Sequence, residues 1–174
     1  MNDSFIFPLN GLAQGRNEFR LRAGKAFFES YENPEILDAD LSVAVLIEKS
    51  GRDITVDCDI QGTVTVACDR CLEDLDIVVD EHPALAVRFG GPEEEDGEGD
   101  AREPVFLNPA DTELDLSQTV YDYACLAVPI HKVHPEGGCN PETIRFLQTS
   151  EEPGAPAGDT PFAALRDLFE DNGK

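Results

Sequence analysis

The chain has 174 residues, and 41% of them are hydrophobic, which is enough for one domain with a modest core. It carries 36 acidic and 13 basic side chains, so its formal net charge is −23. A body this acidic repels phosphate backbones, which disfavours direct nucleic-acid binding over a broad face and favours cations or a basic protein partner. A salt-adapted host would produce the same balance.

Targeting signals are not visible in the sequence. No apolar run approaches the roughly 18 residues that indicate a membrane-spanning helix. The first residues, MNDSFIFPLNG, lack the basic region and long apolar core of an export signal. Five cysteines in such a chain predict free thiols or a metal site rather than a disulfide framework. We therefore expect a cytoplasmic protein.

Alternating apolar residues predict a β-rich N-terminal half. Antiparallel strands with one buried face show this period of two. Turn signals are KSGR at 49–52 and Pro83, and Gly62 is expected to interrupt a long strand. The predicted strands or extended segments cover residues 5–9, 19–28, 41–47, 54–60, 64–68, 75–79 and 85–89.

An acidic loop and two helices are predicted after these strands. Residues 90–103, GGPEEEDGEGDARE, indicate a solvated loop and lack the spacing of an EF-hand. After a strand at 105–109, residues 112–129 predict a helix with Asp115 as its cap and Gln118 completing a capping box. A flexible linker is expected at 149–160, followed by a helical tail at 161–172 that docks on the body or on a partner.

The order of these elements favours an α+β domain over residues 1–148. We expect a mainly antiparallel β-sheet or a partly closed barrel, with one or two helices in the C-terminal half.

The chemistry that the sequence offers lies in its cysteines and histidines. Cys68 and Cys71 form a CxxC pair at a strand end, and two thiolates three residues apart can supply half of a tetrahedral zinc site. The later segment PIHKVHPEGGCN supplies imidazole and thiolate in a loop that can fold around an ion. The preferred metal ligands are Cys68, Cys71, His134 and Cys139, with His131 as a substitute.

Two other interpretations of the CxxC pair remain open. The cysteines can be small buried residues that bracket a turn, as Cys58 and Cys125 are expected to be in their strand and helix. A redox pair is the third possibility, although such pairs open helices, and Glu73 and Asp74 would raise the thiol pKa. Arg70 lies at the tip of the turn, where it either forms a local salt bridge or contacts a partner.

The order of three motifs resembles that of a known family. These motifs are Cys68-x-Arg70-Cys71-Leu72, the segment from Pro129 to Cys139, and PFAALRDL at 161–168. Over roughly residues 40–170 the chain resembles the bacterial YceD family of large ribosomal RNA subunit accumulation proteins. The family motif maps onto Cys68, Arg70, Cys71 and Cys139, and no catalytic residues come with it.

The resemblance implies a small cytoplasmic, non-enzymatic ribosome-biogenesis factor that supports accumulation, processing or stability of the large-subunit ribosomal RNA. The net charge favours basic ribosomal or assembly proteins as its direct contacts over RNA. One alternative is a zinc- or thiol-dependent enzyme, which would need an open metal position and a general base. Another is an acidic scaffold that binds a basic partner through its terminal helix.

Overall fold

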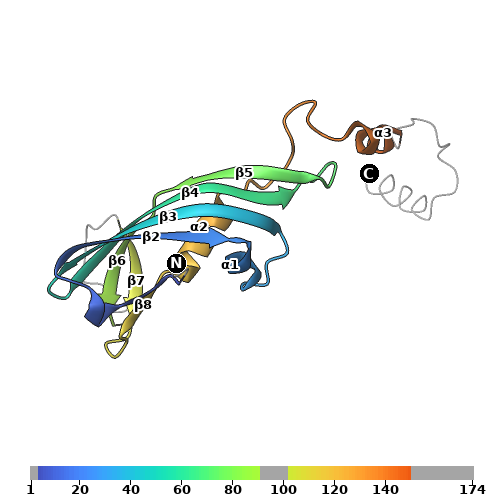
Figure 1. Ribbon diagram of the computed structural model, residues 1–174. Coiled ribbons are helices and arrows are strands. Elements are labelled where there is room, and N and C mark those ends of the chain that lie inside the picture. The colour runs from blue at the N-terminus through green and yellow to red at the C-terminus, as the bar shows by residue number, and fades with distance from the viewer. Residues whose placement is uncertain (1–3, 91–101, 150–174) are drawn as a thin grey trace, which may run out of the picture.

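The fold is that of a computed structural model, which describes residues 4–90 and 102–149 (Figure 1). Its N-terminal elements are β1 (Ile6–Pro8), a short 3₁₀ turn (Leu9–Gly11), β2 (Gly15–Gly24), α1 (Lys25–Glu29), β3 (Ile36–Ser50), β4 (Asp53–Ala67), β5 (Asp74–Glu81) and β6 (Ala84–Phe89). They are followed by β7 (Glu103–Leu107), β8 (Glu113–Asp115), α2 (Ser117–Leu126) and α3 (Pro141–Thr149).

The main sheet has the strand order β2-β3-β4-β6-β7, with β5 paired beside the C-terminal half of β4. All of these pairs are antiparallel except β6 with β7, which is parallel. The α+β class is confirmed. Of the two expected forms of the sheet, the partly closed barrel is wrong, and the sheet is mixed rather than purely antiparallel. Within the described residues the sheet is open because its edge strands β2 and β7 do not pair with each other, and β1 and β8 form a separate two-stranded sheet.

The predicted alternation produces two 15-residue strands, β3 and β4, joined at the predicted turn. Leu41, Val43, Val45 and Ile47 of β3 are all at most 1% exposed and face the core. Each such side chain contributes about 1.5–3 kcal/mol when it is removed from water. The opposite face carries Asp57, Asp59 and other polar residues and remains open to solvent.

Gly62 does not interrupt β4, contrary to the prediction. Its φ of +149° lies in a region that side chains rarely adopt, and a Cβ there would lie 2.1 Å from the carbonyl oxygen of Asp40 on β3. The glycine therefore allows β3 and β4 to remain paired at a close approach, and the long strand runs through it.

Helix α2 packs under the arch of the sheet, and Figure 1 shows the long strands passing over it. Val120 and Ala124 of the helix, with Leu116 directly before it, are fully inaccessible to solvent. α1 joins this layer through Phe28, whose ring centroid lies 6.0 Å from that of Tyr121. Just after α1, the ring of Tyr31 stacks on Tyr121 with centroids 4.1 Å apart. α1 lies in the N-terminal half, outside the region in which helices were expected.

The predicted start of α2 was too early. Residues 113–115 form β8, and the helix begins at Ser117 after Leu116. The Asp115 carboxylate does accept a hydrogen bond from the Ser117 backbone N–H at 2.8 Å. The Gln118 amide instead donates to Asp122, four residues ahead, so the expected capping box does not form.

Several predicted segments lie outside the described residues. These are most of the acidic loop at 90–103, the linker at 149–160 and the tail helix at 161–172. None of the helices that the structure describes is long and apolar enough to cross a membrane.

Candidate metal centre

The CxxC pair lies in the tight turn that connects β4 to β5. The Leu72 backbone N–H donates to the Cys68 carbonyl at 2.8 Å, and the Cys68 N–H donates to the Glu73 carbonyl at 2.9 Å. Leu72 itself takes a left-handed conformation with φ +61°, which lets the chain reverse within a few residues. The turn leaves both Cys68 and Cys71 buried, at 0% and 5% exposure.

The segment after α2 is held against this turn by backbone and side-chain hydrogen bonds. The Asp69 N–H donates to the Lys132 carbonyl at 2.6 Å, and the Lys132 N–H donates to the Asp69 carboxylate at 2.8 Å. Farther along, the Asn140 amide donates to the Glu73 carboxylate at 2.6 Å. Residues more than 60 positions apart in the sequence are thereby brought together before the chain continues into α3 (Figure 1).

Four potential metal ligands converge between the turn and this segment. One ligand atom from each of Cys68, Cys71, His134 and Cys139 lies within 4.8 Å of all the others. The Cys71 sulfur is 3.4 Å and the Cys139 sulfur 4.0 Å from His134 Nδ1, and the Cys68 and Cys139 sulfurs are 3.9 Å apart. Three sulfurs and one imidazole nitrogen are a ligand set that zinc commonly takes in structural sites, where it binds four ligands tetrahedrally.

The orientation of His134 favours metal binding. Its Nε2 is 3.0 Å from the Asp74 carbonyl oxygen, which can only accept a hydrogen bond, so the proton of the neutral ring resides on Nε2. Nδ1 then carries the free lone pair and faces the sulfurs. Metal-bound histidines are typically fixed by such a bond from their other nitrogen.

Electrostatics within the cluster prepare one thiol for coordination. Burial acts to raise the pKa of Cys68, but hydrogen bonds from the backbone N–H groups of Cys71, Arg70 and His134 outweigh it and lower the pKa to about 6. Hydrogen bonding to Cys68 raises the pKa of His134, whereas burial raises that of Cys139. Without a metal, the cluster therefore places the Cys68 thiolate beside the His134 imidazole, whose affinity for a proton is higher than usual. A bound cation would take the place of the proton on that imidazole.

The other predicted residues occupy separate positions. His131 is exposed and is not part of the cluster. Arg70 is exposed at the tip of the turn, and its guanidinium makes no ion pair with the described part of the chain. Cys58 is buried in β4, where burial raises its pKa to about 12. Cys125 is half-buried on α2, and burial also raises its pKa.

Two features of the site were not predicted from the sequence. The Asp74 carbonyl that orients His134 is a backbone group, and backbone groups leave no compositional signal. The tether between Asp69 and Lys132 depends on a turn that projects one carboxylate toward a distant backbone N–H. One sequence feature could have indicated this Asp69–Lys132 contact, namely the acidic residue directly after the first cysteine of the CxxC turn.

The open face of the sheet carries a second group of titratable side chains, which the sequence analysis also missed. His82 lies 3.3 Å from the Asp59 carboxylate and 3.4 Å from that of Asp80. Continuing the β4–β5 register places His82 directly opposite Asp59, which explains the cluster. All three side chains are about half exposed or more. Asp59 faces His82 across the strand pair, and Asp80 lies two residues before it, so this is a polar cluster on the surface of the sheet.

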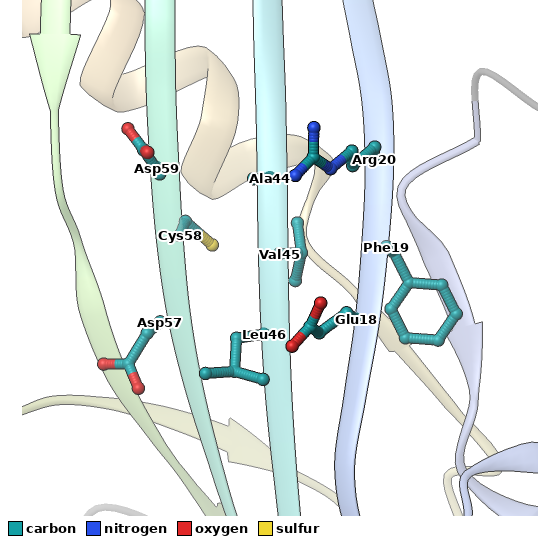
Figure 2. Close-up of a pocket in the computed structure, with 9 residues that line it drawn as sticks. All are labelled: Glu18, Phe19, Arg20, Ala44, Val45, Leu46, Asp57, Cys58 and Asp59. Carbon is teal, nitrogen blue, oxygen red and sulfur yellow. The ribbon is translucent and has the colours of Figure 1, made fainter.

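A shallow cavity of about 220 Å³ lies on the same open face (Figure 2). Apolar Ala44 and Leu46 on β3 form its floor, while Glu18 and Arg20 of β2 lie on one side and Asp57 and Asp59 of β4 on the other. It lies along the N-terminal half of β4, whereas the cysteine cluster lies beyond the strand's C-terminal end. We assign the functional site to the cysteine cluster because its ligand chemistry is more specific than a mixed-charge surface groove.

The fold and the cluster define a small α+β protein with a four-ligand thiolate and imidazole site. A family model described as large ribosomal RNA subunit accumulation protein YceD matches residues 56–169. The match includes the CxxC turn, both histidines of the later segment and Cys139, and it extends over more than half of the chain. The chain therefore belongs to the YceD family. No curated protein and no solved structure matches it.

Proposed function

We propose that this protein is a non-enzymatic factor that supports accumulation of the large-subunit ribosomal RNA and acts through contacts with basic ribosomal or assembly proteins. The observation that carries the proposal is the family match over residues 56–169. The net charge of −23 supports the choice of partner, because phosphate backbones are repelled and cationic proteins attracted.

The proposal includes a structural zinc ion at Cys68, Cys71, His134 and Cys139. Structural zinc sites use four protein ligands, whereas catalytic sites keep one position for water. Four ligand atoms lie within 4.8 Å of one another here, so a bound zinc would have four protein ligands and no position left for water. This closed ligand set supports a stabilising role and argues against a zinc hydrolase. When bound, zinc would link the β4–β5 turn to the segment that leads into α3.

A deletion strain tests the proposed function. We expect a reduced level of large-subunit ribosomal RNA and fewer large ribosomal particles, both restored by the wild-type gene. RNA quantification and sedimentation of ribosomal particles measure the two outcomes. A deletion strain with normal large-subunit RNA would contradict the proposal.

Affinity capture tests the proposed class of partner. At moderate salt we expect basic ribosomal or assembly proteins to be recovered with the tagged chain and identified by mass spectrometry. Nuclease treatment of the extract should leave these proteins bound. Recovery of naked ribosomal RNA without basic proteins would show that the contact is with RNA.

Elemental analysis of protein purified without chelators tests the zinc site. We expect about one zinc per chain and loss of most of it in Cys71→Ser. Cys125→Ser is the matched control, because Cys125 lies on α2 outside the cluster and should leave the zinc content unchanged. Equal zinc content in the wild type and Cys71→Ser would contradict this assignment.

A further inference from the structure

Large apolar side chains are exposed on the two segments that the candidate metal site holds together. We call these segments, residues 69–74 and 130–136, the clip tip. Leu72 is 77%, Ile130 93% and Val133 41% exposed. The hydrogen bonds between Asp69 and Lys132 hold the segments side by side. Exposed apolar residues grouped on one structural feature are typical of interaction sites.

Leu72 adds an independent observation, because its backbone conformation disfavours the residue that is present. Its φ of +61° lies in the left-handed region, where glycine or asparagine is preferred. A leucine there is strained, and its side chain gains nothing from burial because 77% of it is exposed. The stability of the fold therefore gives no reason for a leucine at position 72, whereas a contact between its side chain and a binding partner would give one. Strained residues of this kind commonly occur at functional sites.

The charges around the clip tip indicate the chemistry of the partner. Residues 69–74 and 130–136 contain four carboxylates, Asp69, Glu73, Asp74 and Glu136, and two cations. One of these cations, Lys132, is only 19% exposed, and its ammonium lies 3.8 Å from Glu35 and 3.9 Å from Asp69. Its charge is therefore balanced by these two carboxylates, which leaves Glu73, Asp74 and Glu136 against the single cation Arg70. Apolar residues bordered by acidic ones fit a basic, amphipathic segment.

We infer that the clip tip is the surface that receives a basic amphipathic segment of a protein partner, with Leu72, Ile130 and Val133 as its apolar contacts. This inference rests on the proposed function, since it assigns the surface through which the basic partner binds. Arg70, exposed at the same turn, is placed to pair with a carboxylate or a terminal carbonyl of that segment. A second copy of this chain is disfavoured as the occupant, because two bodies of charge −23 repel each other.

The zinc-loaded full chain and two defined peptides provide the test. The first peptide is an amphipathic helix of leucine and lysine, and the second replaces its leucines with serine at equal charge. We compare wild type, the tip variant Leu72→Ser/Ile130→Ser and the control Val78→Ser by fluorescence anisotropy. Val78 is 73% exposed on β5, so its replacement removes a similar apolar area away from the tip.

We expect the tip variant to bind the leucine–lysine peptide at least about fivefold more weakly, with Val78→Ser within about twofold of the wild type. The serine–lysine peptide should bind more weakly than the leucine–lysine peptide. Equal weakening by both variants, no effect of the tip variant, or tighter binding of a single-stranded RNA oligonucleotide would overturn the inference. If the double variant loses zinc, Ile130→Ser alone replaces it, because Ile130 is 93% exposed and is not a ligand.

Photo-crosslinking in cells separates this inference from the proposed function. A photoreactive residue at position 72 is expected to capture a protein of high isoelectric point, whereas the same residue at position 78 is not. Capture of such a protein from position 78 but not from position 72 would show that the partner does not bind at the clip tip. That result would not contradict the proposed function. Normal large-subunit RNA in the deletion strain would overturn the proposed function, whatever the peptides bind.

Discussion

Gly62 allows the two longest strands of the sheet to approach each other in mid-sheet. Its φ is +149°, and an added Cβ would meet the Asp40 carbonyl oxygen at 2.1 Å and the Leu41 Cα at 3.0 Å. Backbone atoms of a paired strand cannot move aside as a flexible side chain can. A substitution at this position must therefore separate the strands, strain the backbone, or both.

We predict that Gly62→Ala lowers the free energy of unfolding by about 3 kcal/mol or more, because steric overlap adds to backbone strain. Gly51→Ala is the matched control. Gly51 also has a positive φ, of +65°, but no atom lies within 4 Å of its added Cβ, so only about 1 kcal/mol of strain is expected. Urea denaturation measures the free energy of unfolding of the two variants. Equal decreases in the two would show that the contact with Asp40 is not the cause.

Cys58 gives the stability of the fold a specific dependence on alkaline pH. Burial, followed by the nearby Asp57 charge, raises its pKa from 9.0 to about 12. Between these values the thiol ionises in the unfolded chain but stays protonated in the folded one. The unfolded state then binds fewer protons, so its free energy falls relative to the folded state as the pH rises.

We predict that Cys58→Ala removes part of the loss of stability above about pH 9. The Cys58 contribution is present below pH 9 and declines by about 1.4 kcal/mol per pH unit toward pH 12. The measurement is the slope of the unfolding free energy against pH in the wild type and the variant. The comparison of slopes cancels the constant cost of the cavity that the substitution leaves. Identical slopes would show that Cys58 ionises equally in both states.

At the scale of elements, the candidate zinc site lies at one end of the sheet and has its own small core. Val66, Cys68, Cys71 and Leu75 form this core, apart from the main hydrophobic cluster around β3, β4 and α2. The segment after α2 reaches it through hydrogen bonds at Asp69 and Glu73. Metal removal should therefore loosen this end and leave the main sheet intact.

We predict that chelation increases amide hydrogen exchange in residues 68–73 and 128–140 while the centre of β3 and β4 stays protected. Local opening requires less free energy than global unfolding where few buried contacts hold a segment. Exchange measured by mass spectrometry with and without EDTA tests this. A uniform increase over the whole chain would instead mean that the metal supports the entire fold.

The sequence predicts the central elements well, because a period of two over two long strands has few alternative explanations. The sequence wrongly predicts that Gly62 interrupts its strand. A glycine that ends a strand and one that allows a neighbouring strand to approach closely cannot be distinguished unless the neighbouring strand is known. The parallel pairing of β6 with β7 depends on the path of the chain between them, which local patterns do not specify. The ligand types were visible in the sequence, but the choice between His131 and His134 depends on loop geometry.

At the scale of the whole molecule, carboxylates far outnumber the cations that could pair with them. The chain has 36 acidic and 13 basic side chains. The ion pair of Arg22 with Asp40 is largely exposed and that of Arg102 with Asp57 is partly exposed, and exposed pairs contribute at most about 1 kcal/mol each. Salt screens both the attraction and the repulsion, so its net effect on stability reports which of them dominates.

We predict that raising KCl from about 10 mM to about 500 mM increases the urea midpoint of unfolding, because the folded state concentrates the net charge of −23 in a small volume. The control is Asp53→Lys/Glu136→Lys, which replaces two exposed carboxylates and makes the net charge less negative. Its midpoint should rise less with salt. A midpoint that falls with KCl in the wild type would show that ion pairs, rather than repulsion, dominate the electrostatics of the fold.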